Sequence, residues 1–197
     1  SGKTVPEDTG TYPKSALVTT DTEIESQSMV DYLCSCGHKR IAFITSGDEG
    51  LGRCHLNGYK RSLEKNGLEY DEKLIIRLKP GKRIYTIENG YNCTCELLKS
   101  GVDFSCIYAI SDTLAVGACR AVIDSGKRVP EDYCVAGADG QDIAEYYHPS
   151  ITTLKYPRVE IALQSVRTLF DLINRKKVVK RQILGGTLIE RESTRKL

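Results

Sequence analysis

The fold of this chain can be predicted outward from Ile107-Tyr-Ala-Ile-Ser-Asp-Thr-Leu-Ala-Val-Gly-Ala-Cys-Arg-Ala-Val-Ile-Asp-Ser-Gly-Lys-Arg-Val-Pro-Glu-Asp132. The apolar run at 106–110 predicts a strand buried on both faces, as in the interior of a parallel sheet. Ser111 and Asp112 predict the start of a helix, because their side chains can accept hydrogen bonds from the free N–H groups of its first turn. Apolar residues then recur at helical spacing up to Gly126, which predicts the helix end.

A second apolar run, 133–138, follows this helix and predicts another buried strand. Strand, helix and strand together form a β-α-β unit with parallel strands. Polar residues come directly after both strands: Ser111 and Asp112 after the first, and Asp139 after the second. Because ligands of α/β proteins bind outside the carboxyl ends of the strands, we expect the binding site at these residues.

Composition and charge are ordinary for a globular protein. The 197 residues are 40% hydrophobic and 27% charged, which allows a substantial core. The net charge is +2, from 28 basic and 26 acidic residues, so charge alone does not predict a nucleic-acid binder, and any DNA contact needs another segment. No apolar run is long enough to span a bilayer and no signal peptide pattern begins at Ser1, so we expect no membrane partner.

The eight cysteines raise the question of a metal site or disulfides. Cys34 with Cys36, and Cys93 with Cys95, superficially resemble two halves of a metal site. Both pairs fall in predicted helices, where residues two apart point about 200° apart around the axis, so neither pair can easily hold one ion. We expect no metal and no cofactor, and free thiols that indicate a reducing cytoplasm.

Strands and helices alternate on both sides of this unit. The expected upstream elements are strands at 16–20, 41–44 and 74–78 and helices at 23–36, 51–65 and 83–99, after an irregular start. Downstream, an irregular stretch up to Pro149 precedes a strand at 151–154, a helix opened by Pro157 and a final strand at 182–190. This order predicts an α/β fold with a doubly wound parallel sheet.

The helix that begins at Pro157 has the clearest amphipathic pattern in the chain. Its apolar stripe consists of Val159, Ala162, Leu163, Val166, Leu169, Phe170 and Ile173. An apolar stripe left open to water promotes association, so we expect another chain or a repacked segment to cover it.

Six segments form an ordered set along the chain: Gly37-His-Lys-Arg-Ile-Ala-Phe-Ile44, Gly58-Tyr-Lys-Arg-Ser-Leu63, Ala109-Ile-Ser-Asp-Thr-Leu-Ala-Val-Gly117, Val129-Pro-Glu-Asp132, Pro149-Ser-Ile-Thr-Thr-Leu154 and Leu188-Ile-Glu-Arg-Glu-Ser193. In this order and approximate spacing they resemble the effector-binding core of the lac-repressor and galactose-repressor family of bacterial transcription regulators. No single segment is decisive, whereas the set covers about 16–193.

The resemblance implies a periplasmic-binding-protein-like fold, in which two doubly wound α/β lobes, joined by three crossing strands, bind a small molecule in a cleft. Family members carry a helix-turn-helix and most of the first lobe before a segment like 16–21, so we expect an N-terminally truncated fragment with one complete lobe. The expected boundaries are an irregular segment at 1–15, a remnant of the N-terminal lobe at 16–38, the C-terminal effector-binding lobe at 39–150, a crossover strand and helix of the N-terminal lobe at 151–178, and a returning strand and tail at 179–197.

The resemblance also implies ligand contacts. Asp21 and Asp139 follow strands, where a carboxylate can accept hydrogen bonds from sugar hydroxyls, although Asp21 can equally be a plain helix cap. Three residues before Gly58 the family usually carries an arginine that grips the ligand, but this chain has His55. Arg53 is a candidate replacement, and His55 can equally be a half-buried polar residue.

The remaining candidates are Ser111, Asp112 and Tyr85. Ser111 stands where many relatives carry an amide and is followed by a matching Asp112, but a helix cap explains the serine and a structural role the aspartate. Tyr85 lies near the family's aromatic stacking position and is the candidate for packing on a sugar face, although a surface tyrosine is equally common. The expected ligand set is therefore Asp21, Arg53, His55, Tyr85, Ser111, Asp112 and Asp139.

By resemblance, the predicted function is a non-enzymatic sensor of a sugar or similar effector that changes the DNA affinity of a homodimeric regulator. Operator DNA would be bound by a helix-turn-helix absent from this chain. The alternative is a periplasmic-type sugar receptor of the same fold, which an export signal and few free cysteines would favour. An enzyme is a third possibility, but the sequence has no nucleophile elbow, phosphate loop or zinc spacing.

Overall fold

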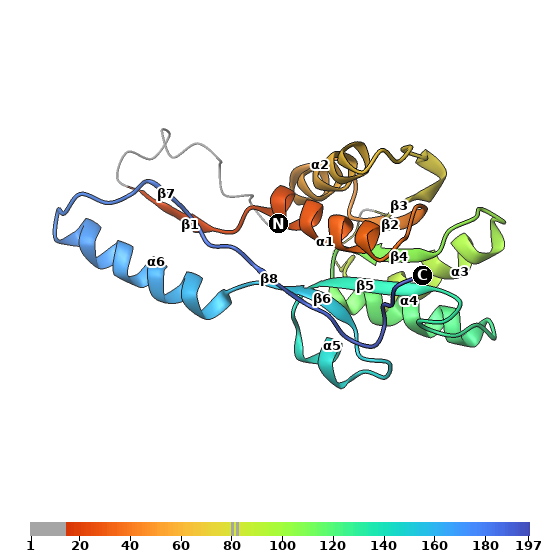
Figure 1. Cartoon of the computed structure of the whole chain (residues 1–197). Coiled ribbons are helices and arrows are strands. Elements are labelled where there is room, and N and C mark those ends of the chain that lie inside the picture. Colours follow the sequence, from red (N-terminus) through yellow and green to blue (C-terminus); the bar gives the residue numbers. More distant parts are fainter. Residues whose placement is uncertain (1–14, 80, 82) are drawn as a thin grey trace. The chain divides into compact units, whose positions relative to one another are not determined.

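A computed structural model describes residues 15–79, 81 and 83–197 of the chain (Figure 1). These residues form two compact units. Unit 1 contains the described residues up to Asp21 together with 156–187, and unit 2 contains 22–155 and 188–197. The chain therefore passes between the units three times. The irregular segment expected at 1–15 lies outside the described residues except for Ser15.

Unit 2 is built on a sheet whose strand order is β3-β2-β4-β5-β6-β8. The strands are β2 (Ile41–Thr45), β3 (Ile75–Arg77), β4 (Cys106–Ala109), β5 (Cys134–Asp139), β6 (Thr152–Lys155) and β8 (Thr187–Ile189). The pairs β2–β3, β2–β4, β4–β5 and β5–β6 are all parallel. This arrangement confirms the predicted α/β class, with the two apolar runs around Ile107 and Val135 as neighbouring buried strands.

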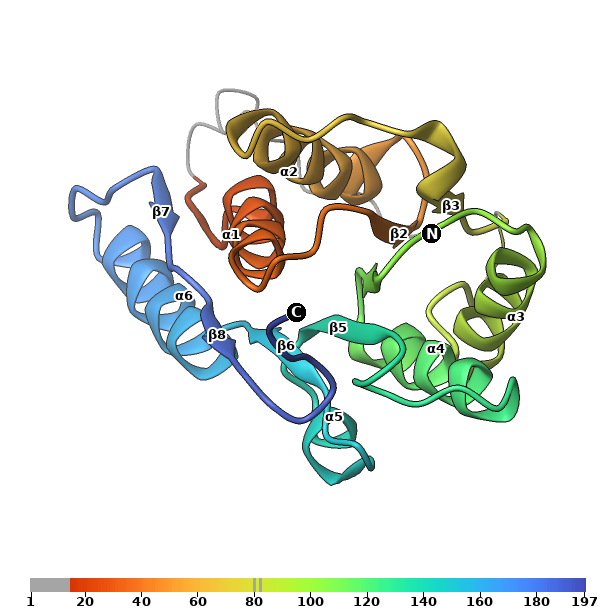
Figure 2. The same ribbon diagram turned by 45° about the vertical axis from the view of Figure 1, so that its right-hand side comes forward.

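Helices cover both faces of this sheet. On one side α1 (Thr22–Ser35) packs against α2 (Gly50–Lys65), and on the other α3 (Ile87–Lys99) packs against α4 (Asp112–Asp124), as Figure 2 shows. Two short helices, η2 (Glu72–Leu74) and α5 (Asp142–Tyr146), complete the unit. The sheet is therefore doubly wound, as predicted.

The core of unit 2 lies where the central strands meet the helices. All residues of β2 and β4 are buried. The Phe43 ring stacks on Tyr59 from α2 and on Tyr108 from β4, with centroids 4.9 and 5.2 Å apart. Close helix packing needs glycine: a Cβ built on Gly58 would collide with the Glu23 backbone oxygen of α1, and one on Gly117 with the Ile87 backbone oxygen of α3. The helix pairs therefore approach with their backbones almost in contact.

Unit 1 is smaller and built differently. Its strands β1 (Leu17–Thr19) and β7 (Arg181–Ile183) form a two-stranded parallel sheet, and α6 (Arg158–Ile173) packs against β1. The only buried residue of α6 is Thr168, whose hydroxyl accepts a hydrogen bond from Gln182 Nε2 at 3.0 Å. The Gln182 side-chain oxygen in turn accepts one from Gln164 at 2.7 Å. Six large side chains of the predicted stripe are exposed: Val159, Leu163, Val166, Leu169, Phe170 and Ile173.

The structure differs from the sequence-based expectation at five places. The single final strand expected at 182–190 is wrong: Gly185 and Gly186 separate β7 and β8, which belong to different sheets. A short helix, α5, forms in the stretch expected to be irregular, and α3 begins at Ile87 rather than at residue 83. Helix α1 and strand β6, assigned from the sequence to the other lobe, lie in unit 2, because α1 packs on α2 and β6 pairs with β5.

Candidate functional site

The sheet of unit 2 has a switch point between β2 and β4. From β2 the chain continues to β3 on one side, whereas β4, β5 and β6 follow on the other. In doubly wound proteins with this strand order, ligands bind outside the carboxyl ends of the strands near such a point. Ser111 and Asp112 follow β4, and Asp139 ends β5. The structure therefore brings these three predicted residues to the same edge of the sheet.

Ser111 is the N-cap of α4. Its backbone is extended, and its hydroxyl accepts a hydrogen bond from the Leu114 amide at 3.3 Å. The side chain is almost completely buried. Capping accounts for a serine at this position without a ligand.

Asp112 is fully buried beside Ser111. Its Oδ1 accepts a hydrogen bond from the Thr153 hydroxyl of β6 at 2.6 Å, and its Oδ2 accepts one from the Gln141 backbone amide at 2.6 Å. Burial raises the pKa of Asp112 to about 6, although the bonds from Thr153 and Gln141 oppose this shift, and the nearby Asp139 charge adds to it. Each carboxylate oxygen thus already has a protein donor.

Asp139 is the last residue of β5 and is only partly buried. Its backbone has a positive φ of 99°, a conformation that L-residues adopt uncommonly. Its Oδ2 accepts a hydrogen bond from Gln141 Nε2 at 2.9 Å. A carboxylate that remains partly exposed at the carboxyl end of a buried strand can accept hydrogen bonds from the hydroxyl groups of a ligand.

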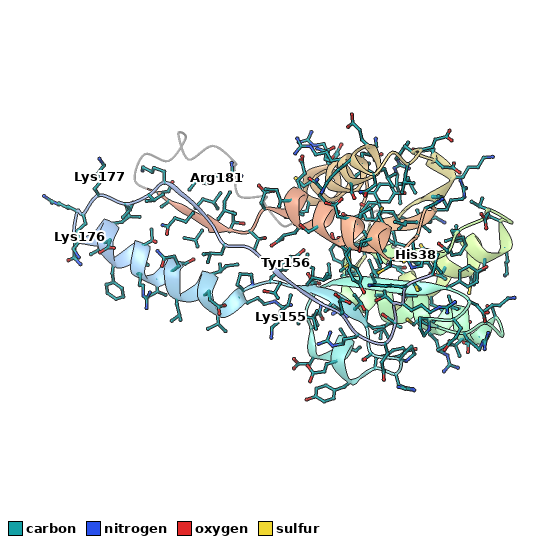
Figure 3. The ribbon with its side chains drawn as sticks, viewed as in Figure 1. His38, Lys155, Tyr156, Lys176, Lys177 and Arg181 are labelled. Carbon is teal, nitrogen blue, oxygen red and sulfur yellow. The ribbon has the colours of Figure 1, made fainter. Side chains whose placement is uncertain are left out.

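Lys155 was not predicted, yet it lies at the same edge. It ends β6 directly opposite Asp139 in the β5–β6 register and is exposed, next to Tyr156 (Figure 3). In the sequence, Lys155 is the basic residue that directly follows the strand expected at 151–154, and β6 extends one residue further, to include it. The edge also carries Arg77 at the end of β3, whose guanidinium donates to the carboxylates of Asp48 and Glu72.

His55 lies in the interior of unit 2. It is 6% exposed on α2, and its backbone oxygen accepts a hydrogen bond from the Ser26 hydroxyl of α1 at 2.8 Å. Burial lowers the pKa of His55 to about 4, and its buried Nδ1 has no hydrogen-bond partner among the described residues. The imidazole is therefore neutral near pH 7 and is more deeply buried than the half-buried polar residue that the sequence suggests. Arg53, on the same helix, is exposed.

Two predicted residues lie elsewhere in the chain. Tyr85 is 45% exposed and immediately precedes Thr86, the N-cap of α3. Asp21 immediately precedes α1, at the point where the chain passes from unit 1 into unit 2. Ser111, Asp112 and Asp139 thus form the candidate site at the carboxyl edge, and Gln141 and Lys155 join it from the structure.

The described residues also bear on disulfides, metal sites and membrane spans. None of the eight cysteines forms a disulfide with another described cysteine. In residues 15–79, 81 and 83–197 no three His, Cys, Asp or Glu side chains are grouped so that they could hold a metal ion. Over the same residues, no helix is both long and apolar enough to cross a membrane.

Known proteins resemble this chain over most of its length. The sequence profile of the periplasmic binding protein-like domain matches residues 30–194. The HTH-type transcriptional regulator MalR of Clostridium butyricum is 41% identical over 146 residues, which are 74% of this chain and 42% of MalR. A sugar-binding transcriptional regulator of the LacI family from Escherichia coli, solved with phosphate, superposes with a TM-score of 0.82 at 31% identity, covering 90% of this chain and 63% of that one.

A second solved structure, the complex of the transcriptional regulator CelR with cellobiose, superposes with a TM-score of 0.81 at 31% identity. It covers 91% of this chain and 54% of the CelR chain. The chain spans less than half the length of the curated relatives MalR and CelR. The comparisons therefore concern one domain of longer regulators.

Proposed function

The chain belongs to the periplasmic binding protein-like domain family, in the form found in LacI-type transcriptional regulators, and from this premise we propose that it is the effector-binding part of such a regulator. The observation that carries the proposal is Asp139, a partly exposed carboxylate at the carboxyl end of β5 beside the switch point of the sheet. The proposed ligand is a sugar or a similar polyol.

The chemistry of the edge supports a polyol. Asp139 supplies an acceptor, Gln141 has an amide that supplies both a donor and an acceptor, and Lys155 supplies a cationic donor on the neighbouring strand. Hydroxyl groups of a sugar can bond to each of these types. CelR has been solved with cellobiose, and another LacI-family regulator with ribose, which makes both sugars reasonable first probes.

We further propose that the ligand changes the DNA affinity of a homodimeric regulator, through a helix-turn-helix outside this chain. The relatives MalR and CelR are HTH-type regulators, which supports this role over that of an enzyme. An effector can act in this way only if it binds one conformation of the protein more tightly than the other. The alternative, a periplasmic-type sugar receptor, is less favoured because the chain carries eight cysteines that form no disulfide with one another.

The test is calorimetric titration of the chain with cellobiose, maltose and ribose, in the parent and in Asp139→Asn. Replacing the carboxylate should cost about 1.5–3 kcal/mol of binding energy, or roughly tenfold to a hundredfold in affinity, because a charged acceptor is lost. His55→Ala is the comparison variant, since this ring is buried, and the affinity of this variant for the sugar should stay within about twofold of the parent value.

Two outcomes would overturn the proposal. If His55→Ala abolished binding while Asp139→Asn left it unchanged, with both proteins folded by circular dichroism, the site would be misplaced. If none of the three sugars bound to the folded parent chain at millimolar concentration, a simple sugar ligand would be wrong.

A further inference from the structure

We infer that Asp112 is a positioning residue, which joins the turn that carries Asp139 to strand β6, where the chain leaves unit 2. Asp112 does not need to touch the ligand in this role. The inference deepens the proposed function, on which its ligand-binding part rests, whereas its structural part can be tested without any ligand.

The junction is a continuous chain of hydrogen bonds across three elements. Gln141 Nε2 donates to Asp139 Oδ2 at 2.9 Å, and the Gln141 backbone amide donates to Asp112 Oδ2 at 2.6 Å. The Thr153 hydroxyl of β6 donates to the other Asp112 oxygen at 2.6 Å and accepts from the Gly140 amide at 3.3 Å. Among these contacts, only the Asp112 side chain comes from a third element, α4, and bonds to both the β5–α5 turn and β6.

Two glycines let the elements around Asp112 pack closely. A Cβ built on Gly137 would collide with Asp112 Oδ1, so only glycine on β5 lets this carboxylate lie against the strand. A Cβ on Gly140 would collide with the Lys155 side chain, so this glycine lets the turn lie equally close to β6. With no exposed surface and both oxygens occupied, Asp112 acts through the groups that it holds.

Strand β6 is also hydrogen-bonded to residues 191–194, which follow β8. The Thr152 amide donates to Ser193 Oγ at 2.9 Å, and the Arg191 amide donates to Thr152 Oγ1 at 2.9 Å. The Thr152 and Thr194 hydroxyls share a further bond at 2.6 Å. A continuous set of hydrogen bonds therefore connects the Asp139 turn to β6 and, through β6, to the segment that follows β8. The chain passes between the units next to these two elements, at 155/156 and at 187/188.

The charge of Asp112 makes the junction testable by pH. The charged or titratable groups that face Asp112 are Asp139, Arg191 and Tyr108, and burial raises the Asp112 pKa to about 6. Protonation converts the bond from the Gln141 amide from a charge-assisted to a neutral one, which is weaker. The Gln141 amide should therefore be better protected from hydrogen exchange at pH 7.5 than at pH 5, after correction for the intrinsic exchange rate.

The experiment compares amide NMR spectra and hydrogen exchange of the ligand-free chain in four variants. Asp112→Asn keeps the shape and removes the charge, Thr153→Val removes the hydroxyl at constant shape, and Thr153→Ser restores a hydroxyl. Asp124→Asn, on the exposed end of the same helix, is the matched control. Protection of the Gln141 amide should fall about tenfold in Asp112→Asn and Thr153→Val, and stay near the parent value in Thr153→Ser and Asp124→Asn.

The pH dependence separates this role from a merely structural one. In the parent the Gln141 amide resonance should titrate with a midpoint near 6, and in Asp112→Asn this titration should disappear. If Asp112→Asn kept both the titration and the protection of Gln141, the inference would be wrong, whatever the ligand data show.

The ligand arm uses the same variants with whichever of cellobiose, maltose or ribose binds to the parent. Asp112→Asn and Thr153→Val should each weaken binding about tenfold, and the ligand-induced shifts of the Thr152 and Thr153 amides should shrink. Unchanged affinity and unchanged shifts would refute the coupling to β6. Failure of the parent to bind any sugar would instead count against the proposed function, while the exchange arm would still decide whether Asp112 holds the turn.

Discussion

Helices α4 and α6 show how differently the two units use an amphipathic sequence. In unit 2, α4 buries nine of its 13 residues between the sheet and α3. In unit 1, α6 buries one of its 16 residues, and the six large apolar side chains of its stripe are 52–67% exposed. A helical apolar pattern therefore predicts that a helix forms, but not how much of its surface is buried: α4 lies against a six-stranded sheet and α6 against a two-stranded one.

The difference has a physical cause in the two sheets. Unit 2 has six strands, with helices packed on both faces, so that β2 and β4 are buried on both sides. Unit 1 has two strands that pair over three residues, and such a sheet is marginal by itself. The polar bonds of Gln182 to Gln164 and Thr168 hold α6 to β7 in place of a packed core. We therefore expect the free energy of unfolding to reside mainly in unit 2.

The largest expected effect comes from overpacking unit 2. In Gly117→Val, the new side chain would collide with the Ile87 backbone oxygen where α3 and α4 touch, and backbone cannot move aside cheaply. We expect a loss of about 4 kcal/mol, at the upper end for overpacking, measured by urea denaturation. Gly185→Val in unit 1 is the matched control, since no atom of the described residues lies within 4 Å of its Cβ position, and it should change stability by less than about 0.5 kcal/mol.

Equal losses in the two glycine variants would contradict the contrast between the units. Likewise, a Gly117→Val protein as stable as the parent would show that α3 and α4 can separate without cost. Either result would remove the close helix contact as a reason for glycine at 117.

A smaller effect is expected from the buried imidazole of unit 2. The His55 pKa is lowered from 6.5 in the unfolded chain to about 4 by burial, so the unfolded state takes up a proton first as the pH falls. The contribution of the neutral His55 ring to the free energy of unfolding is fully present above pH 6.5. It is lost as the pH falls from 6.5 to about 4, and the total loss is about 3 kcal/mol. Urea denaturation of the parent and His55→Leu at pH 7.5 and 4.5 measures it.

In His55→Leu this component should vanish, so the variant should lose less stability than the parent on acidification. At pH 7.5 the substitution should change stability little, because it also removes a buried Nδ1 that has no hydrogen-bond partner in the described part of the chain. If the parent and His55→Leu lost the same free energy of unfolding between pH 7.5 and 4.5, His55 would be protonated in the folded protein at pH 4.5.

The sheet of unit 2 was predictable because its strands are continuous apolar runs bounded by turn residues. The packing of α1 on α2 was not, since it depends on the absence of a side chain at Gly58, against the Glu23 backbone. The break between β7 and β8 has a local signal in Gly185 and Gly186, but the sequence cannot tell that the two halves pair with β1 and with β6.

The candidate site was predictable only in part. Asp139 could be placed from the end of its strand, because parallel strands put their carboxyl ends at one edge. The role of Asp112 could not, since its partner Thr153 is 41 residues away in sequence. For His55 the pattern allowed a ligand or a buried residue, and only the structure shows that the ring is buried. Lys155 was overlooked because the predicted strand ended at 154.

The smallest expected effect on unfolding, and the sharpest test of the contrast, concerns the exposed stripe of α6. Leu163 and Phe170 are 54% and 61% exposed, so the double substitution Leu163→Glu with Phe170→Glu buries no new charge in the described chain. The free energy of unfolding of unit 2, measured by urea denaturation, should therefore change by less than about 0.5 kcal/mol.

Self-association of the double variant should decrease clearly, because two charges interrupt an apolar surface that otherwise favours contact between molecules. Sedimentation velocity across a concentration series measures this, with Glu64→Gln on the exposed side of α2 as the control. If the parent chain were monomeric at all concentrations while the stripe remained exposed, or if the double variant unfolded unit 2, the two units would not differ in the way that α4 and α6 indicate.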